Sequence, residues 1–368
     1  MRNAYRKGFL FIVLVGLYLI GNAYAVRFAK GPGDFALFWP SSGLALAVVV
    51  RYGLRWVLFV PVAMLLDYLL RQPSPPLFLL FSTLGNTLGA LVGGWLARRR
   101  PLPAYADSRT GFRMLAGGLA LSTVGAVVGS VGMHLSSLLP MSGMLDAMLR
   151  WAMGDLLGVV TVTPALLLFA YRERQQTRIG EPLGYGSESE ALLWNIALVL
   201  SYLLMAWGAT AGGRNALGLS CLPLAVMMWS ALRFEPLRTA IAVLLTVTLI
   251  GGLSGLGLAG FEPPARTLDS VILLSYLCLI AILPITLALV VNERRAATRD
   301  LLHRVSTDPM TGLPNRASLE AIMRRALDHT ATSPRALAYL DLDNIKLVND
   351  TASHTAGDAL ITGIAGLL

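Results

Sequence analysis

The sequence predicts a polytopic α-helical membrane domain followed by a smaller domain of the α/β class. The first observation is composition: 55% of the 368 residues are hydrophobic, 14% are charged, and the mean hydropathy is +0.64. A soluble domain carries about 25% charged residues, so most of this chain suits a bilayer. The second observation is a change to polar sequence at Asn292. We therefore divide the chain into residues 8–292, 293–307 and 308–368.

Ten apolar runs are candidates for membrane-spanning helices, and eight or nine are alternative counts. A helix needs about 20 apolar residues to cross the hydrocarbon core. In chain order the runs lie near residues 8–26, 35–50, 56–70, 76–97, 112–134, 147–171, 191–211, 216–232, 239–258 and 269–291. The second and third runs are short, which leaves tilted, re-entrant or partly merged segments as interpretations.

The distribution of Lys and Arg predicts that both termini lie in the cytoplasm, because cytoplasmic loops carry an excess of these residues. With the N-terminus inside, the outer segments carry only Arg27, Lys30, Arg71, Arg150, Arg214 and Arg266. The inner segments carry the larger share. We therefore interpret the net charge of +9 as a topology signal. The expected partner is the lipid bilayer, and no nucleic acid is expected.

The N-terminus allows an alternative interpretation. Arg2, Arg6 and Lys7 precede an apolar run that ends in "NAYA", which is similar to a cleaved signal peptide. The run is long enough to span a membrane and many more runs follow it, so we favour an uncleaved first helix.

Six polar residues lie in or at the edge of the predicted spans, and Asp155 is the most informative. The six are Asp67, Asn86, His134, Arg150, Asp155 and Asn195. Ionisable groups at this depth are costly and usually face a cavity, a partner or the interface. Gly154 and Gly158 would let another helix approach Asp155 closely. Two interpretations stay open: a ligand pocket, or a polar contact with Arg150 or Asn86 that only fixes packing.

The stretch "FWPSSG", residues 38–43, has a similar character, since Trp39 suits an interfacial anchor and Pro40 suits a break beside a pocket. Together, "FWPSSGLALAVVV" and "WAMGDLLGVVTVTPALLL" resemble the MASE1 domain, a bacterial membrane sensor module, over roughly residues 10–292. The resemblance implies a multi-pass sensor of the bacterial inner (plasma) membrane with an unknown sensory ligand. Asp155 and Trp39 are its candidate sensing residues.

Residues 293–307 are predicted to form a polar linker helix. Leu301, Leu302 and Val305 give it a narrow apolar stripe. One interpretation is a short signalling helix that continues the last span and pairs with a second copy of the chain. The other is a simple linker, and the stripe is too short to decide between them.

The stretch "AYLDLDNIKLVNDTASHTAGD", residues 338–358, concentrates carboxylates and amides near the end of an apolar chain. Residues 336–343 are predicted to form a buried strand with an acidic end. Residues two apart on a strand face the same way, so Asp341 and Asp343 would project together and suit a divalent cation such as Mg²⁺. Lys346 follows closely enough to meet phosphate charge. A solvated acidic strand end is the alternative.

Two motifs in order resemble the start of a GGDEF domain, the catalytic fold of diguanylate cyclases. "DPMTGLPNR", residues 308–316, is similar to the family's D-x-L-T-G-L-x-N-R, with Met310 in place of Leu. Residues 341–358 are similar to its D-x-D-x-F-K-x-x-N-D-x-x-G-H-x-x-G-D. Ile345 replaces Phe and keeps an apolar anchor, whereas Ser353 replaces Gly and is expected to strain a turn that Gly would relax.

The resemblance implies a role in phosphoryl transfer for the first group of matching residues. Asp341 would ligate Mg²⁺ together with the backbone carbonyl of Leu342, and Asp343 would act in support. Lys346 would stabilise phosphate charge in the transition state. Positioning and cation clamping carry the rate in such reactions.

The second group of matching residues is implied to bind GTP. Asn349 and Asp358 would recognise guanine, and His354 would line the substrate site. The resemblance implies that two GTP molecules, one on each of two domains, condense to cyclic di-GMP and pyrophosphate. A homodimer is therefore implied as well.

The resemblance covers only the N-terminal portion of the family domain, and the loop that names the family would follow Leu368. We therefore expect an incomplete GGDEF domain, inactive as it stands, from a longer gene product that is a diguanylate cyclase. One alternative is a degenerate domain in a cyclase–phosphodiesterase fusion. Another is a membrane sensor or transporter without catalysis, although a transporter would show paired broken helices in two related halves.

Overall fold

The structure is a computed structural model that describes residues 2–29, 36–71, 74–99, 107–176, 185–212, 219, 221–258, 261, 263–264, 266–328 and 337–367. It divides into two compact units, Met1–Glu293 and Arg294–Leu368. Four basic residues of the predicted loops lie outside the described residues: Lys30, Arg100, Arg178 and Arg214.

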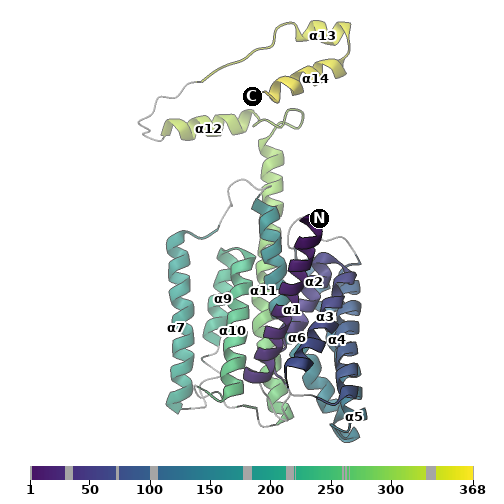
Figure 1. Ribbon diagram of the computed structural model, residues 1–368. Coiled ribbons are helices and arrows are strands. Elements are labelled where there is room, and N and C mark those ends of the chain that lie inside the picture. Colours follow the sequence, from purple (N-terminus) through teal and green to yellow (C-terminus); the bar gives the residue numbers. More distant parts are fainter. Residues whose placement is uncertain are drawn as a thin grey trace. The chain divides into compact units, whose positions relative to one another are not determined.

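The first unit is a helical bundle in the part of the chain that is described (Figure 1). Its first half contains α1 (Arg2–Phe28), α2 (Pro40–Tyr52), the short 3₁₀ helix η2 (Leu54–Leu58), α3 (Phe59–Leu70), α4 (Pro76–Ala97), α5 (Ser108–Leu135) and α6 (Met144–Gln176). Its second half contains α7 (Glu188–Gly212), α9 (Cys221–Arg233), α10 (Pro236–Leu256) and α11 (Thr267–Ser306), which runs on into the second unit.

Seven helices among the described residues are long and apolar enough to cross a membrane. They are Tyr5–Phe28, Pro76–Ala97, Ser108–Leu135, Met141–Ala170, Glu188–Gly208, Pro236–Leu256 and Thr267–Arg299. The other three predicted spans are the shorter helices α2, α3 and α9, of 13, 12 and 13 residues. Thirteen residues rise about 20 Å, short of the roughly 30 Å hydrocarbon core. The described residues therefore contain seven helices long enough for a full span, fewer than the eight to ten spans expected.

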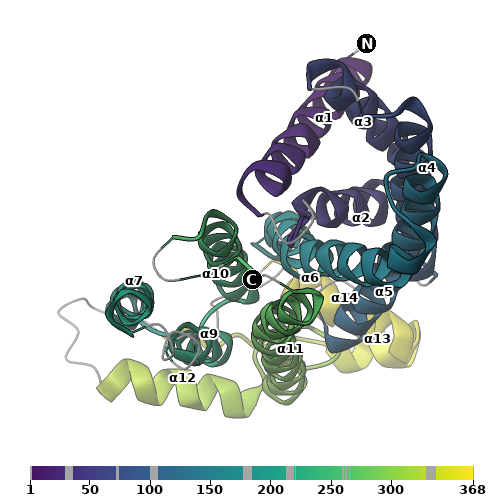
Figure 2. The ribbon, with the colours of Figure 1, turned by 90° about the horizontal axis from the view of Figure 1, so that it is seen from below.

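Helix α2 is short because it is an internal element of the bundle. Ten of its 13 residues, Ser41–Val50, are buried. It contacts α1, α4, α5 and α6, which lie around it in Figure 2. Such a helix shows no amphipathic period, because every face is covered by protein. Length and apolar content alone therefore did not distinguish it from a lipid-facing span.

Helices α4 and α5 pack against each other through closely spaced glycines. Cβ atoms added at Gly85, Gly89 and Gly93, one turn apart on α4, would lie 3.1, 2.7 and 2.4 Å from backbone oxygens of α5. One of those oxygens belongs to Gly117, where an added Cβ would lie 2.6 Å from the Gly93 carbonyl in return. Close backbone approach at small residues is a main source of helix association in membranes. The glycine column therefore holds this helix pair together.

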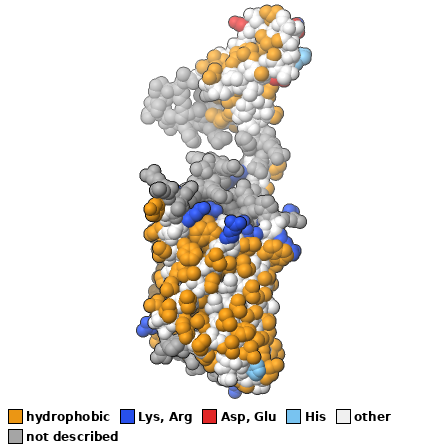
Figure 3. Space-filling model, turned by 45° about the vertical axis from the view of Figure 1, so that its right-hand side comes forward, with side chains coloured by type: hydrophobic (Ala, Val, Ile, Leu, Met, Phe, Trp, Pro, Cys, Tyr) orange, Lys and Arg blue, Asp and Glu red, His pale blue; other side chains and the backbone are white. Residues whose placement is uncertain are grey.

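The start of α1 and the last turns of α11 in this unit lie at the same end of the bundle (Figure 1). Phe11 of α1 packs against Trp56 of η2 with ring centroids 6.5 Å apart. At the start of α5, the Ser108 hydroxyl donates a hydrogen bond of 2.6 Å to Glu293 of α11. The side of the bundle is covered by hydrophobic side chains, and several Lys and Arg side chains gather near one end (Figure 3).

The second unit contains the end of α11 and the helices α12 (Arg316–Asp328), α13 (Ile345–Thr351) and α14 (His354–Ala365). An isolated antiparallel bridge joins Thr307 to Pro314. Residues 337–342 form neither strand nor helix, and residue 336 lies outside the described part. The α/β expectation is therefore not met among the described residues of this unit.

The predicted strand over residues 336–343 is wrong for the residues that are described. A strand needs a neighbouring strand, which supplies hydrogen-bond partners for its backbone N–H and C=O groups. Here the apolar side chains that would face a sheet or a core are open to solvent: Tyr339 is 94% exposed and Leu340 is 67% exposed. The alternating sequence pattern is present, but the described residues provide no neighbouring strand with which this segment could pair.

Candidate functional sites

The two membrane motifs singled out in the sequence meet in the structure. The start of α2 lies against the middle of α6, where the Trp39 amide donates to the Gly154 carbonyl at 3.2 Å. One turn further on, the Ser42 hydroxyl donates to Asp155 Oδ1 at 2.5 Å. "FWPSSG" and the Gly-Asp pair of α6 are more than a hundred residues apart in sequence. They nevertheless form one buried polar contact.

Small residues make this contact possible. A Cβ added at Gly158 would lie 2.0 Å from the Trp39 carbonyl oxygen, and one added at Gly154 would lie 2.9 Å from the Ala36 carbonyl oxygen. On the facing helix, a Cβ at Gly43 would lie 2.1 Å from the Gly158 carbonyl oxygen. The prediction that Gly154 and Gly158 allow close approach to Asp155 is confirmed.

The predicted partners of Asp155 were wrong. Arg150 donates to Asp146 and to Thr267. The Asn86 amide donates to the Ser82 carbonyl of its own helix at 2.9 Å. The actual partner of Asp155 is Ser42, which lies in the other motif. A Ser in an apolar run carries no sequence signal for this role, so the pair could not be assigned before the helices were placed.

The buried contact leaves two polar atoms without a hydrogen bond. Asp155 is 2% exposed, and its second carboxylate oxygen makes no hydrogen bond of good geometry, although the Trp151 side chain also interacts with this carboxylate. The indole nitrogen of Trp39 is likewise buried without a hydrogen bond of good geometry, and the Tyr18 side chain interacts with it. Buried polar atoms without partners are uncommon and call for an explanation. The second carboxylate oxygen of Asp155 could accept a hydrogen bond from a small polar molecule, and the Trp39 indole could donate one.

Three other predicted polar residues have ordinary structural contacts. Asp67 forms an ion pair of 2.8 Å with Arg71, one turn further along the chain. His134 Nδ1 lies 3.0 Å from the Leu139 carbonyl near the end of α5. Asn195 is exposed and lines a pocket beside α7.

In the second unit, the first signature motif forms a closed turn. Asp308 Oδ1 accepts hydrogen bonds from the Thr311 amide at 2.9 Å and from the Thr311 hydroxyl at 3.0 Å. These bonds hold the pKa of Asp308 below its ordinary value. Gly312 has φ of +72°, a conformation that favours glycine. The turn directs the chain into α12, whose first turn is capped by the Asn315 side chain through the Ser318 amide at 3.0 Å.

The residues of the second motif lie on three neighbouring segments. Asp341 and Leu342 precede α13, with Asp341 exposed. Lys346 lies on α13 and is exposed, and His354 and Asp358 lie on α14 and are exposed. Among the described residues, no three Asp, Glu, His or Cys side chains come together as a metal site. The oxygen donors of Asp341 and of the Leu342 carbonyl suit Mg²⁺ chemically, and they would supply only part of its coordination shell.

The best-defined contact of this motif joins α13 to α14. Asn349 Oδ1 is buried without a hydrogen bond, and a Cβ added at Gly357 would lie 1.9 Å from it. Gly357 is therefore needed for the two helices to approach. The strain expected at Ser353 is absent: its φ of 173° is extended backbone, and its hydroxyl caps α14 by accepting from the Ala356 amide at 3.2 Å.

A bundle of apolar helices long enough to span a bilayer, followed by a separate unit with a signature turn, defines the class of multi-pass membrane proteins with a further C-terminal domain. The chain matches the MASE1 family over residues 9–295, and it therefore belongs to that family. Residues 305–368 match the family described as diguanylate cyclase, GGDEF domain. Both resemblances predicted from the sequence are confirmed.

Curated relatives resemble the C-terminal part of the chain. "Cyclic di-GMP phosphodiesterase PdeR" of Escherichia coli is 40% identical over 75 residues, which are 20% of this chain and 11% of that protein. "Probable diguanylate cyclase DgcE" of Escherichia coli is 42% identical over 80 residues, 21% of this chain and 7% of that protein. "Diguanylate cyclase DgcP" of Pseudomonas aeruginosa is 42% identical over 71 residues, 19% of this chain and 11% of that protein.

The chain thus aligns with only about a tenth of the length of these relatives. No solved structure matches the chain.

Proposed function

We propose that this chain is the membrane sensor and the first part of the cyclase domain of a protein that regulates cyclic di-GMP synthesis. One observation carries the proposal: a MASE1 region, residues 9–295, is followed directly by a GGDEF region, residues 305–368. A signal received among the membrane helices would pass through α11, the continuous helix that belongs to both units. The activity itself would condense two GTP molecules to cyclic di-GMP.

The proposed chemistry assigns the second signature motif to GTP. Asp341 and the carbonyl of Leu342 would hold Mg²⁺, and Lys346 would meet phosphate charge. Asn349, His354 and Asp358 would bind the nucleotide. This proposal is supported by the order and spacing of the matching residues and by the diguanylate cyclases among the relatives.

The proposed setting is the inner membrane of a bacterium, with the GGDEF part in the cytoplasm, where GTP is available. The chain would act as a homodimer, because each of two domains presents one GTP. The bias of Arg and Lys toward the predicted inner segments supports this orientation. A reporter fused after Arg295 should be active only as a cytoplasmic reporter, and alkaline phosphatase activity at that junction would contradict the orientation.

We further propose that the contact between Asp155 and Ser42 belongs to the sensing site, together with the indole nitrogen of Trp39. The support is the combination of a buried carboxylate oxygen and a buried indole N–H, neither of which makes a hydrogen bond of good geometry within the described residues. Asp155→Asn should change cyclic di-GMP output while the protein still inserts and accumulates. Asp67→Asn is the matched control, because that carboxylate is already paired with Arg71. If Asp155→Asn only prevents accumulation, a packing role is the better explanation.

The enzymatic proposal is tested in membranes that carry the complete gene product, supplied with GTP and Mg²⁺, with cyclic di-GMP measured by mass spectrometry. Asp341→Ala should lower the rate by about 10²–10³, as loss of an electrostatic group at a reacting phosphate does. Asn349→Ala should instead raise the GTP requirement and weaken the preference over ATP. Glu320→Ala on the exposed face of α12 is the control. Unchanged synthesis by Asp341→Ala would refute the metal assignment.

A degenerate domain remains the second candidate, because one relative is named as a cyclic di-GMP phosphodiesterase. In that case the wild-type membranes make no cyclic di-GMP under any condition. The protein would then bind GTP and regulate a phosphodiesterase, and GTP would change cyclic di-GMP hydrolysis rather than synthesis.

A further inference from the structure

A pocket opens between α7 and α10 at the end of the bundle where both helices begin. α9 contacts both of these helices (Figure 2). Further into the bundle, the hydroxyl of Tyr202 on α7 lies 2.7 Å from the Thr246 hydroxyl of α10, and this hydrogen bond closes the gap. From Arg238 to Thr246 the space is about 12 Å long, at 1.5 Å per helical residue. It is therefore a slot that runs parallel to the helices.

Arg238 gives this pocket a positive charge for which the described residues supply no ion-pair partner. The residue lines the pocket from the first turn of α10 and is half-buried. None of the ion pairs among the described residues includes its guanidinium, and its Nη1 atom is buried without a hydrogen bond. An arginine at this depth normally pairs with a carboxylate or a phosphate. The free guanidinium is thus the feature that calls for a ligand.

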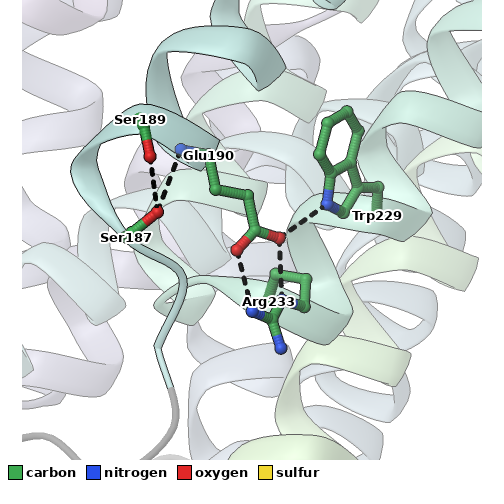
Figure 4. Close-up of polar contacts among 5 residues, drawn as sticks. All are labelled: Ser187, Ser189, Glu190, Trp229 and Arg233. Carbon is green, nitrogen blue, oxygen red and sulfur yellow. Dashed lines mark hydrogen bonds and ion pairs between the residues drawn. The ribbon is translucent and has the colours of Figure 1, made fainter.

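Arg233, at the same end of the bundle, differs from Arg238 because its guanidinium is paired with a carboxylate (Figure 4). Arg233 Nε and Nη2 donate to the two carboxylate oxygens of Glu190 at 2.7 and 2.8 Å. The same carboxylate accepts from the Trp229 indole at 3.0 Å. This group ties the start of α7 to α9, and Glu190 is paired with Arg233 rather than with Arg238. The two arginines therefore differ in pairing while they share charge and location.

Two aromatic rings hold the guanidinium of Arg238 in place. It lies 4.6 Å from the ring centroid of Phe234 and 5.7 Å from that of Trp194. The two rings pack edge to face with centroids 5.8 Å apart, and the Trp194 indole donates to the Val226 carbonyl at 2.8 Å. Cation–π contact positions the charge but does not neutralise it. A preorganised cation of this kind loses little side-chain entropy when an anion binds.

Apart from Asn195, the part of the slot beyond Arg238 is lined by apolar side chains. Ile241 and Leu245 lie on the same face of α10 as Arg238, at spacings of three and seven residues, and Leu198 faces the slot from α7. At the outer rim, the exposed side chain of Glu188 lines the entrance. This carboxylate disfavours a free polyanion. It tolerates a weakly charged head group that is held by its own hydrocarbon chain.

We infer that the slot between α7 and α10 binds a membrane amphiphile, with its anionic head group on Arg238 and an acyl chain along Leu198, Ile241 and Leu245. Anionic phospholipids and fatty acids share this chemistry, and the ligand enters from the bilayer rather than from the aqueous phase. The inference goes beyond the proposed cyclase function and does not depend on it.

The test is native mass spectrometry of the 368-residue chain in detergent, titrated with phosphatidylglycerol, with phosphatidylcholine of the same acyl chains, and with inorganic phosphate. Phosphatidylglycerol should bind the wild type more tightly than phosphatidylcholine. Arg238→Gln should lower its affinity about 10- to 100-fold, as loss of a charge-assisted hydrogen bond does. Arg233→Gln, which removes the same charge nearby, should change it by no more than about twofold.

Three results would overturn the inference: equal losses for both arginine variants, equal affinity for the two lipids, or inorganic phosphate that binds as tightly as phosphatidylglycerol. Ile241→Trp gives an independent test, because Ile241 is 44% exposed and a larger side chain there narrows the slot while the Arg238 charge is retained. It should lower phosphatidylglycerol affinity as well. If Arg238→Gln does not fold, an unchanged affinity in Ile241→Trp overturns the inference by itself.

Discussion

The close contact between α2 and α6 can be tested with the smallest possible change, Gly158→Ala. The added methyl would lie 2.0 Å from the Trp39 carbonyl oxygen, where an ordinary contact begins at 3.4 Å. The start of α2 must therefore retreat by about 1.4 Å. Both contacting groups are backbone, so no side-chain rotation can absorb the change. A shift of that size would also stretch the bond between Ser42 and Asp155 from 2.5 Å to beyond hydrogen-bonding range.

The loss of stability expected for Gly158→Ala follows from the close contact and from the weakened hydrogen bond. Overpacking a tight contact costs about 1–3 kcal/mol, and a buried acceptor that loses its donor costs about 1–3 kcal/mol. We therefore expect the free energy of unfolding to fall by about 2–6 kcal/mol, and Tm to fall by about 5 °C or more. The assay is thermal unfolding of the purified chain in detergent, followed by tryptophan fluorescence.

Gly16→Ala is the matched control, because a Cβ at Gly16 meets nothing within 4 Å. It should leave Tm unchanged or raise it slightly, since Ala is favoured over Gly inside a helix. A double-mutant cycle with Ser42→Ala adds a second check. If Gly158→Ala already breaks the hydrogen bond, Ser42→Ala should cost clearly less in that background than alone. Equal Tm values for Gly158→Ala and wild type would refute the close-contact argument.

In the second unit, Gly357→Ala should push α14 away from α13, because its methyl would lie 1.9 Å from Asn349 Oδ1. Circular dichroism should show a lower melting temperature, and intact melting would contradict the contact. Asp308→Ala should speed hydrogen exchange at the Thr311 amide, whereas Asp350→Ala, which removes an exposed carboxylate, should not. Since the folded pKa of Asp308 is lowered, this protection should persist at neutral pH and disappear as the pH falls below about 4. Protection that is unchanged at low pH would count against the role of the carboxylate.

The sequence was most informative where unusual residues interrupt an apolar background. Trp39 and Asp155 were noticed for that reason, and the structure brings their motifs together. Gly154 and Gly158 could also be interpreted in advance, since small residues one turn apart permit close helix approach. The same signal was present in Gly85, Gly89 and Gly93 of α4, spaced four apart, and it was overlooked. That repeat would have predicted the α4–α5 contact.

Other features could not be predicted, because they depend on what surrounds a segment. The run at residues 35–50 is apolar enough for a span, but α2 is short and enclosed by other helices. The pattern at residues 336–343 is that of a buried strand, yet pairing needs a neighbour that the described residues do not provide. The partner of Asp155 depends on the register of α2 against α6. Local sequence does not encode that register.

The position of α2 offers a physical reason why a carboxylate is tolerated at Asp155. Pro40 is the first residue of α2, and its missing N–H removes one of the donors that a helix start leaves unpaired. Ser42 lies in that first turn, so Asp155 sits at the positive end of the α2 dipole as well as on the Ser42 hydroxyl. Because α2 begins inside the bundle, the positive end of its dipole is shielded from water. Electrostatic interactions are stronger in such a low-dielectric interior than in water. The short internal helix and the buried acid are thus parts of one arrangement, in which the start of α2 supplies the hydrogen bond and the positive dipole end that Asp155 faces.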